Sequence, residues 1–278
     1  MMGPWLKAKH FHQTSSRSGV VKSKDRDASI DQIQAEQYSF PYHYIPNVNG
    51  YPKFSRRSAY APSYLAAIQI STDWLLRHCL NNLNGDLHKH IDIGCGDGGF
   101  IHALTQCEIP ESVEFTGIDM DQRAIAWATM FNPSIRFTTE SVSEVESDAW
   151  DSGSVVEVIE HIPPAELPTF VSNVGRVIRP NGSLFVTVPS TEIAISAKHY
   201  QHFTFESLKS VFGDMFEVVE CFGFERKNWL TRTYFRHFFK RRFHLEIGKM
   251  SRYIIRTYAA KHARLRGCGR IGLMLKVR

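Results

Sequence analysis

The stretch HIDIGCGDGG, residues 90–99, constrains the fold of this chain more than any other. Its first half is short and largely apolar, as in a buried strand, and its second half holds glycine at four of six positions. Glycine accepts a positive φ and lets a ligand approach the backbone. A strand that ends in such a loop and leads into a helix is typical of an open α/β sheet, which binds ligands at the carboxyl ends of its strands.

The segments around this loop alternate between helix and strand patterns. Apolar periodicity predicts helices over 63–83, 99–106, 122–131, 165–178 and 204–212, the last one capped by Thr204. Short apolar runs predict strands over 89–94, 113–119, 134–139, 154–159, 183–189, 216–224 and 269–277, with a turn at 180–182. The predicted fold class is therefore α/β, with a doubly wound, seven-stranded and mostly parallel sheet.

Charge is distributed unevenly along the chain. The net charge is +5, yet residues 225–267 alone hold 13 Lys and Arg against two Asp and Glu. Apolar residues recur there near helical spacing, which predicts a basic helical insertion before the last strand; they are Ile247, Met250, Ile254, Tyr258 and Leu265. Such a helix either contacts an anionic acceptor or a membrane surface peripherally, or docks as a lid on the acidic body of the protein.

Three segments follow from these patterns: a basic, flexible tail over 1–37, an aromatic segment over 38–62 and a domain over 63–278 that contains the insertion 225–267. In the aromatic segment, Tyr42, His43 and Tyr44 either cover an acceptor site or pack on the core. No apolar run approaches about 18 residues, no apolar leader is found, and the five cysteines form no C-x-x-C pair. We therefore expect a cytoplasmic protein with no transmembrane segment.

The glycine loop satisfies two cofactor fingerprints at once. Glycines 94, 96 and 99 fit the dinucleotide pattern G-x-G-x-x-G, and glycines 94, 96 and 98 fit G-x-G-x-G, the pattern of S-adenosylmethionine (SAM) sites. Asp119 ends the second strand, where a carboxylate can accept hydrogen bonds from the ribose of either cofactor. Asp92 favours SAM, because it supplies the acid of the pattern D-x-G-x-G-x-G, and so does the doubled glycine at 98–99.

With these motifs in order, residues 60–225 resemble the class I SAM-dependent methyltransferases of the type 11/12 branch. IDIGCGDGG is similar to motif I, GIDMD to the ribose motif, EVIEHI to the strand-four motif, and RVIRPNGSLFVTVPS to the helix, turn and strand that follow. The resemblance implies a Rossmann-like fold, SAM as cofactor and in-line methyl transfer, in which positioning does most of the work. The expected acceptor is a small molecule or a glycan precursor.

The same resemblance implies which residues surround the cofactor. Asp92, Gly94, Cys95 and Gly96 line its methionine side, and Glu157 lies near the methionine moiety. Asp119 holds the ribose, with Met120 against the adenine. The acid at the adenine edge is either Glu140 or Glu144, and Glu140 is the residue we select.

The motifs EVIEH and KHYQH carry the strongest indication of the acceptor side. They place His161, His199 and His202 after the fourth and fifth strands, at one edge of the sheet, where one histidine can act as a general base. As an alternative, Glu157, Glu160, His161 and His202 would bind a divalent cation.

The metal alternative rests on E-x-x-E-H with a later histidine, which is similar to the small-RNA 3′-terminal 2′-O-methyltransferases. That family continues into F-E-W-T-R, whereas this chain reads FTFES, so we predict no metal and do not favour nucleic acid as acceptor. A third hypothesis is a protein that retains the SAM fold without catalysis.

Overall fold

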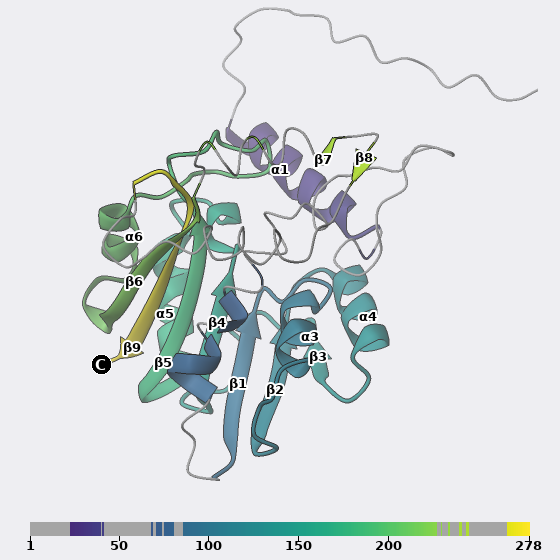
Figure 1. Ribbon diagram of the computed structural model, residues 1–278, viewed down its shortest axis with the longest axis vertical. Helices are drawn as coiled ribbons and strands as arrows, with labels where there is room; N and C mark the ends of the chain where they lie inside the picture. The colour runs from purple at the N-terminus through teal and green to yellow at the C-terminus, as the bar shows by residue number, and fades with distance from the viewer. Residues whose placement is uncertain are drawn as a thin grey trace, which may run out of the picture.

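The computed structural model describes residues 23–39, 41, 68, 71–73, 75–80, 86–226, 229, 233, 239–240, 243–244 and 266–278. Over these residues, strands and helices alternate around one central sheet (Figure 1). The described structure therefore matches the α/β class that the sequence predicts.

The central sheet has seven strands in the order β3-β2-β1-β4-β5-β9-β6. The strands β1 to β5 are parallel to their neighbours, whereas β9 runs antiparallel between β5 and β6. The prediction of a seven-stranded, mostly parallel sheet is confirmed. The bounds are β1 (His88–Ile93), β2 (Val113–Ile118), β3 (Arg136–Thr138), β4 (Trp150–Val156), β5 (Ile178–Pro189), β6 (Phe216–Arg226) and β9 (Cys268–Val277).

Four helices follow these strands: α3 (Gly99–Thr105), α4 (Gln122–Phe131), α5 (Leu167–Val177) and α6 (Phe205–Phe212). Asp121 caps α4, because its side chain accepts from the backbone of Arg123 and Ala124. The predicted cap of α6 is confirmed, since Thr204 accepts from the Ser207 backbone in a reciprocal capping box. The helix starts are thus encoded by local side chains.

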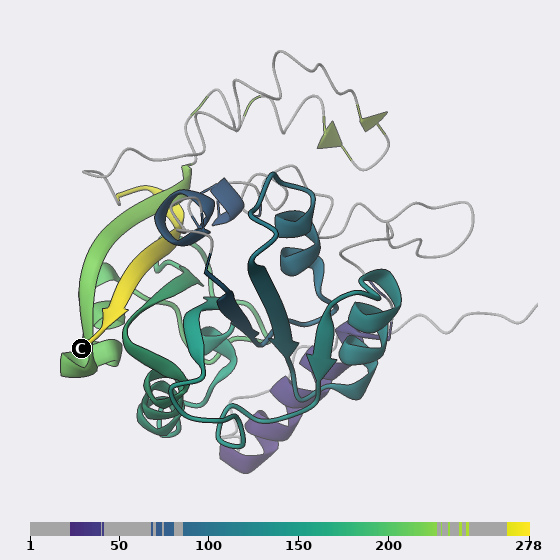
Figure 2. The ribbon, with the colours of Figure 1, turned by 90° about the horizontal axis from the view of Figure 1, so that it is seen from below.

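Apolar side chains cover both faces of the sheet. On one face, β-branched residues of β1, β4 and β5 pack with α5 and α6. On the other face, Phe115 and Phe185 pack with α3 and with residues 75–80. Figure 2 shows the sheet between these helical layers. Burial on both faces explains why its central strands read as nearly continuous apolar runs.

Two predicted boundaries differ from the structure. The strand expected over 154–159 ends at Val156, and Ile159–His161 form a 3-10 turn instead. The turn expected at 180–182 lies inside β5. Ile178 pairs with Trp150 and Ser183 pairs with Ser152, so residues 179–182 form an irregularity in the pairing between β5 and β4. The pairing of Ile178 lengthens the strand beyond the apolar run that predicted it.

The flanking segments are described only in part. Helix α1, Ser23–Gln37, lies within the segment predicted to be a flexible tail. Tyr42, His43 and Tyr44 lie outside the described residues, as does the predicted amphipathic helix over 247–265. In the insertion, β7 (Phe239–Lys240) and β8 (Phe243–His244) form a short antiparallel pair. Among the described helices none has the length and apolarity to cross a membrane.

Candidate cofactor and acceptor site

The glycine loop after β1 has no room for side chains at two positions. Gly94 has φ 76°, and a Cβ built on it would lie 2.5 Å from Val158 Cγ2. Gly96 has φ 56°, and its Cβ would lie 2.5 Å from the Tyr38 hydroxyl. Left-handed backbone disfavours any other residue there. The loop is therefore a backbone cradle, the form expected where a nucleoside cofactor approaches closely.

Two carboxylates flank this cradle, as predicted from the sequence. Asp119, at the end of β2, accepts from the Gly96 backbone nitrogen at 2.9 Å and from the Asp121 backbone nitrogen at 2.9 Å. Burial raises the pKa of Asp119, although these two hydrogen bonds oppose the shift. Asp92 on β1 is 2% exposed, and burial raises its pKa to about 7. Asp92 thus precedes the glycine loop on β1, and Asp119 contacts the loop from the end of β2.

Other predicted cofactor residues lie around the same edge. Cys95 is buried and its thiol pKa is raised well above the usual value, so it is an inert side chain. Met120 is 78% exposed directly after Asp119, which leaves an apolar side chain free to cover a base. Glu140 is exposed and accepts from Thr138 Oγ1 at 3.0 Å, whereas Glu144 accepts from the Ser141 backbone and closes its own turn. Glu140 is thus the more available acid.

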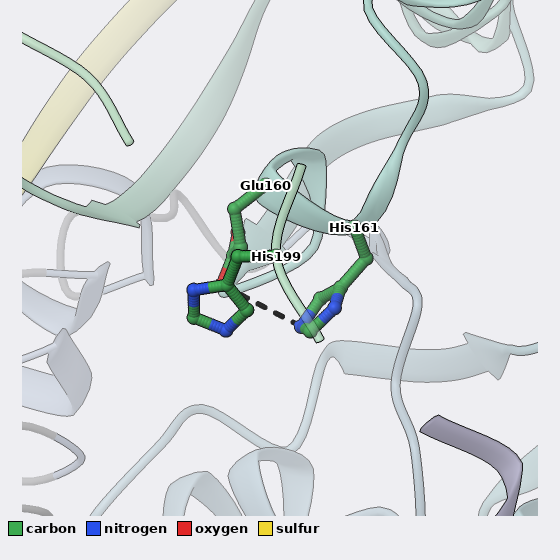
Figure 3. Close-up of side chains that lie close together, drawn as sticks. All are labelled: Glu160, His161 and His199. Carbon is green, nitrogen blue, oxygen red and sulfur yellow. Dashed lines mark ion pairs between the residues drawn. The ribbon is translucent and has the colours of Figure 1, made fainter. Parts of the chain in front are cut away.

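On the other side of the sheet edge, two loops come together at the histidine motifs. The 3-10 turn after β4 carries Glu160 and His161, and the loop after β5 carries His199. The Tyr200 backbone nitrogen donates to the Glu160 carbonyl at 2.9 Å, and His161 Nδ1 lies 3.0 Å from the Lys198 carbonyl. Figure 3 shows the three side chains grouped in this space.

Hydrogen bonds to carbonyls determine which ring nitrogens carry protons. His161 Nδ1 must donate to the Lys198 carbonyl, which leaves its Nε2 with a lone pair. His202 Nδ1 must likewise donate to the Ile193 carbonyl at 3.2 Å, so its Nε2 accepts from His199 Nδ1 at 2.8 Å. His199 Nε2 therefore also has a lone pair. The site offers two imidazoles in their neutral form.

Burial keeps these imidazoles neutral. Burial, together with the smaller effect of the Lys198 cation, lowers the pKa of His161 to about 4. Burial, with smaller contributions from His161 and then Lys198, lowers the pKa of His199 to about 3. Burial also raises the pKa of Glu160 well above its usual value, and the Glu157 charge adds to this rise. The Glu160 oxygen Oε2 is buried and has no hydrogen-bond partner among the described residues. The site therefore groups a buried carboxyl group with two neutral imidazoles.

Glu157, predicted near the methionine moiety, belongs to an ion cluster that the sequence did not predict. Its Oε2 lies 2.9 Å from Arg270 Nε, and Thr187 donates to its Oε1 at 3.2 Å. Arg270 on β9 also pairs with Glu225 on β6. Glu157 and Glu225 both have φ 57°, a left-handed conformation that is uncommon outside glycine and clusters at functional sites. Arg270 is the one charge in the run GRIGLML, which is the signal that could have found it.

The ligand set of the metal alternative is rearranged in the structure. Among the described residues, Glu160, His161 and His199 can place one ligand atom each within 4.8 Å of one another. His202 uses Nε2 to bind His199, and Glu157 is paired with Arg270. The structure therefore brings together two of the four residues predicted as ligands and adds His199.

Helix α1 connects the two sides of the site. Its last residue, Gln37, accepts from Lys198 Nζ at 3.2 Å, and Tyr38 lies over the glycine loop. Trp127 of α4 donates its indole N–H to the Tyr38 carbonyl at 3.1 Å. Figure 1 shows α1 at the end of the sheet where the glycine loop and the histidine loops lie. The sequence does not predict this contact, because its pattern over residues 1–37 predicts a flexible tail.

Known proteins share this fold. Residues 91–182 match the family model described as "Methyltransferase domain". A 118-residue segment is 24% identical to the "Ubiquinone biosynthesis O-methyltransferase" of Vibrio cholerae, and it covers 40% of this chain and 46% of that relative's length. The match thus spans less than half of the curated relative.

Solved structures resemble the whole described fold. The 1,6-didemethyltoxoflavin-N1-methyltransferase of Burkholderia thailandensis, with bound S-adenosylhomocysteine, has a TM-score of 0.57 at 14% identity, over 94% of this chain and 93% of its own. The magnesium protoporphyrin IX methyltransferase of Synechocystis, with bound SAM, has a TM-score of 0.57 at 13% identity, over 94% of this chain and 100% of its own. Residues 91–182 thus match a methyltransferase domain, and the described residues share the fold of these methyltransferases.

Proposed function

We propose that this protein is a SAM-dependent methyltransferase that acts on a small molecule through an oxygen with an acidic proton. SAM supplies a methyl group on a positively charged sulfur. The glycine cradle with Asp92 on its methionine side and Asp119 on the ribose supports cofactor binding. Met120 and Glu140 would line the adenine.

The observation that carries the acceptor assignment is the pair of buried, neutral imidazoles of His161 and His199. When an acceptor O–H attacks the methyl carbon, the carbon–sulfur bond breaks and the acceptor must lose its proton. A lone pair on either Nε2 can take that proton. His202 acts through His199, because its own Nε2 is occupied by the His199 Nδ1 proton.

The low pKa values of these imidazoles leave both of them unprotonated at neutral pH, so each can accept a proton. Because they are weak bases, the acceptor hydroxyl must itself lose its proton readily. Among small-molecule hydroxyls, those of phenols and enols are more acidic than those of alcohols, and we propose them as acceptors. Lys198 is largely buried beside the histidines and would stabilise the resulting oxyanion. The relative from Vibrio cholerae named above is an O-methyltransferase, which supports an oxygen acceptor, although the match covers only 46% of that relative's length.

A second candidate function is metal-dependent methylation of a ribose hydroxyl. The grouping of Glu160, His161 and His199, with an unpartnered carboxylate oxygen, favours it. Against it, Lys198 and Arg270 place two positive charges close to Glu160. A retained fold without catalysis is the third hypothesis, which the complete cradle and both carboxylates disfavour.

The test is calorimetric titration with SAM and with NAD, followed by transfer of labelled methyl groups to pools of phenols, glycans and short RNAs. We expect saturable binding of SAM, no binding of NAD, and label in the phenol pool. Competition between NAD and SAM would overturn the cofactor assignment. Label in RNA that requires a divalent cation would favour the second candidate.

A further inference from the structure

A row of buried polar side chains crosses the apolar face of the sheet and ends at the cofactor carboxylate. From the amino end of β1, His88 Nε2 lies 2.8 Å from Ser152 Oγ, which lies 2.7 Å from His90 Nδ1. His90 Nε2 lies 3.0 Å from Ser154 Oγ, and Ser154 donates to Asp92 Oδ1 at 2.6 Å. The row thus spans β1 from its first residue to the glycine loop.

Sheet register produces this row. His88, His90 and Asp92 alternate along β1 and so point to one face. β4 pairs in parallel with His90 opposite Ser152 and Asp92 opposite Ser154. The row therefore lies between Phe115 and Phe185, since Phe115 on β2 pairs with His90 and Phe185 on β5 pairs with Ser154.

The hydrogen bonds of the row all point the same way when Asp92 is ionised. Ser154 has one proton and gives it to Asp92, so it accepts from His90 Nε2. His90 Nδ1 then accepts from Ser152, and Ser152 accepts from His88 Nε2. Hydrogen bonds in such a chain polarise one another and strengthen the last donor. Burial lowers the pKa of His90 to about 3, so it stays neutral as this arrangement requires.

Packing alone does not account for the row. His90, Ser152 and Ser154 are 0% exposed within an aromatic layer, where apolar residues would avoid the desolvation of polar groups. Apolar side chains of the same shape are often neutral or stabilising in such positions. We propose that His88, Ser152, His90 and Ser154 are positioning residues, which keep Asp92 as a carboxylate directed at the cofactor's methionine ammonium group. This inference rests on the proposed function, since it assumes SAM as the ligand.

The surroundings of Asp92 favour its protonated form, so a hydrogen-bond donor is needed to keep it ionised. Asp119 at the end of β2 raises the pKa of Asp92 by repulsion, and burial raises it more. From the glycine loop, Asp97 raises the pKa of Asp119, the neighbour of Asp92, by repulsion. On β1 itself His90 is neutral, so it contributes no compensating charge. The Ser154 hydrogen bond is the effect that lowers the pKa of Asp92.

The sign of the pH dependence follows. Asp92 binds an ammonium group only when ionised, so cofactor affinity should fall as pH drops through its pKa. Ser154→Ala removes the donor, raises that pKa and moves the loss of affinity to higher pH by roughly one to two units. Ser154→Thr keeps a hydroxyl and should restore the wild-type midpoint. His90→Phe leaves Ser154 in place but unpolarised, so we expect a smaller shift in the same direction.

The experiment measures S-adenosylhomocysteine affinity by calorimetry from about pH 5.5 to about pH 8.5, a range that brackets the raised pKa. Wild type is compared with Ser154→Ala, Ser154→Thr, His90→Phe and the control Ile91→Val, which trims the opposite face of β1. Titration of the Asp92 carboxyl carbon by NMR in the cofactor-free protein gives a readout independent of ligand. Any pH dependence that comes from the ionisation of S-adenosylhomocysteine itself is the same for every variant, so it does not affect the differences between them.

The outcomes separate this inference from the proposed function. No binding at any pH by the wild type would refute SAM binding. Binding whose pH profile is identical in wild type, Ser154→Ala and His90→Phe would refute the positioning role. Should Ser154→Ala not fold, a wild-type Asp92 carbon that titrates below about pH 4, as an unperturbed carboxyl does, would also overturn it. Shifted midpoints with rescue by Ser154→Thr would support it.

Discussion

The glycine side and the histidine side of the site differ in how they are held in place. The glycine side, residues 92–119, consists of one strand–loop–helix–strand unit, and its geometry comes from backbone: positive φ at Gly94 and Gly96, and amide hydrogen bonds to Asp119. The histidine side joins loops after β4 and β5 through ionisable side chains.

This difference predicts different consequences of mutation. Changes on the glycine side should alter folding and cofactor affinity together, because the same backbone does both. Changes on the histidine side should alter turnover and pH dependence while leaving cofactor affinity nearly unchanged, because acceptor chemistry uses another wall of the site.

The largest expected effect is on turnover. His199→Ala should lower methyl transfer by about 100-fold or more, the usual contribution of a general base, with S-adenosylhomocysteine affinity nearly unchanged. His202 acts through His199, so His202→Ala should lower methyl transfer less, also with affinity nearly unchanged. Single-turnover transfer of labelled methyl groups and calorimetry measure the two quantities. His102→Ala on α3, away from these loops, is the control. Equal losses in turnover and affinity would remove the distinction between the two sides.

The next effect is on stability. Gly94→Ala should reduce the free energy of unfolding by roughly 3 kcal/mol, since it adds left-handed strain and a contact with Val158. Gly267→Ala is a matched control, because Gly267 has φ 79° but nothing within 4 Å of its added Cβ. It should cost only the backbone strain, about 1–2 kcal/mol. Urea unfolding measures the free energy of unfolding of both variants. Equal losses would show that the Val158 side chain moves aside for the added methyl group.

A third prediction concerns cofactor affinity alone. Asp119→Ala should weaken S-adenosylhomocysteine binding by about 1–3 kcal/mol, the loss expected when polar ligand groups lose a charged partner. Glu140→Ala, at the exposed adenine edge, should weaken it less. Calorimetry at one salt concentration compares them. Unchanged affinity in Asp119→Ala would be incompatible with a ribose contact at this position.

A smaller effect concerns stability at mildly acidic pH. His161 has a pKa of about 4 when folded and about 6.5 when unfolded, so the unfolded chain binds the proton first as pH falls. Between about pH 6.5 and pH 5 the free energy of unfolding should decrease by about 1.6 kcal/mol from this residue. His161→Gln should remove that part of the slope in urea unfolding. A slope unaffected by the substitution would argue against a buried neutral His161.

The smallest expected effect is that of metal removal. We expect turnover to survive a chelator, because Lys198 and Arg270 lie near Glu160 and disfavour a cation. The measurement is single-turnover transfer after chelation, with and without manganese. Loss of activity that manganese restores would favour the metal-dependent alternative and place the ligands at Glu160, His161 and His199.

Local sequence patterns determined most of the fold and the glycine side of the site. The order of strands and helices, the cap at Thr204, the cradle and the acids Asp92 and Asp119 were predictable. Each depends on neighbours within a few residues: apolar periodicity, glycine conformational freedom, or a side chain that bonds its own helix start. Helix α1, inside the tail predicted over 1–37, and the extension of β5 through 180–182 were not predictable in this way.

Only the tertiary structure decided the rest. His199 rather than His202 faces Glu160, Arg270 pairs with Glu157 across 113 positions, and Ser154 meets Asp92 across 62. These contacts depend on strand register and on how two loops cross, and no local pattern encodes either. The physical reason is that the ionisation of Glu160, Asp92 and the histidines is set by burial among distant segments, which exists only once the sheet has formed.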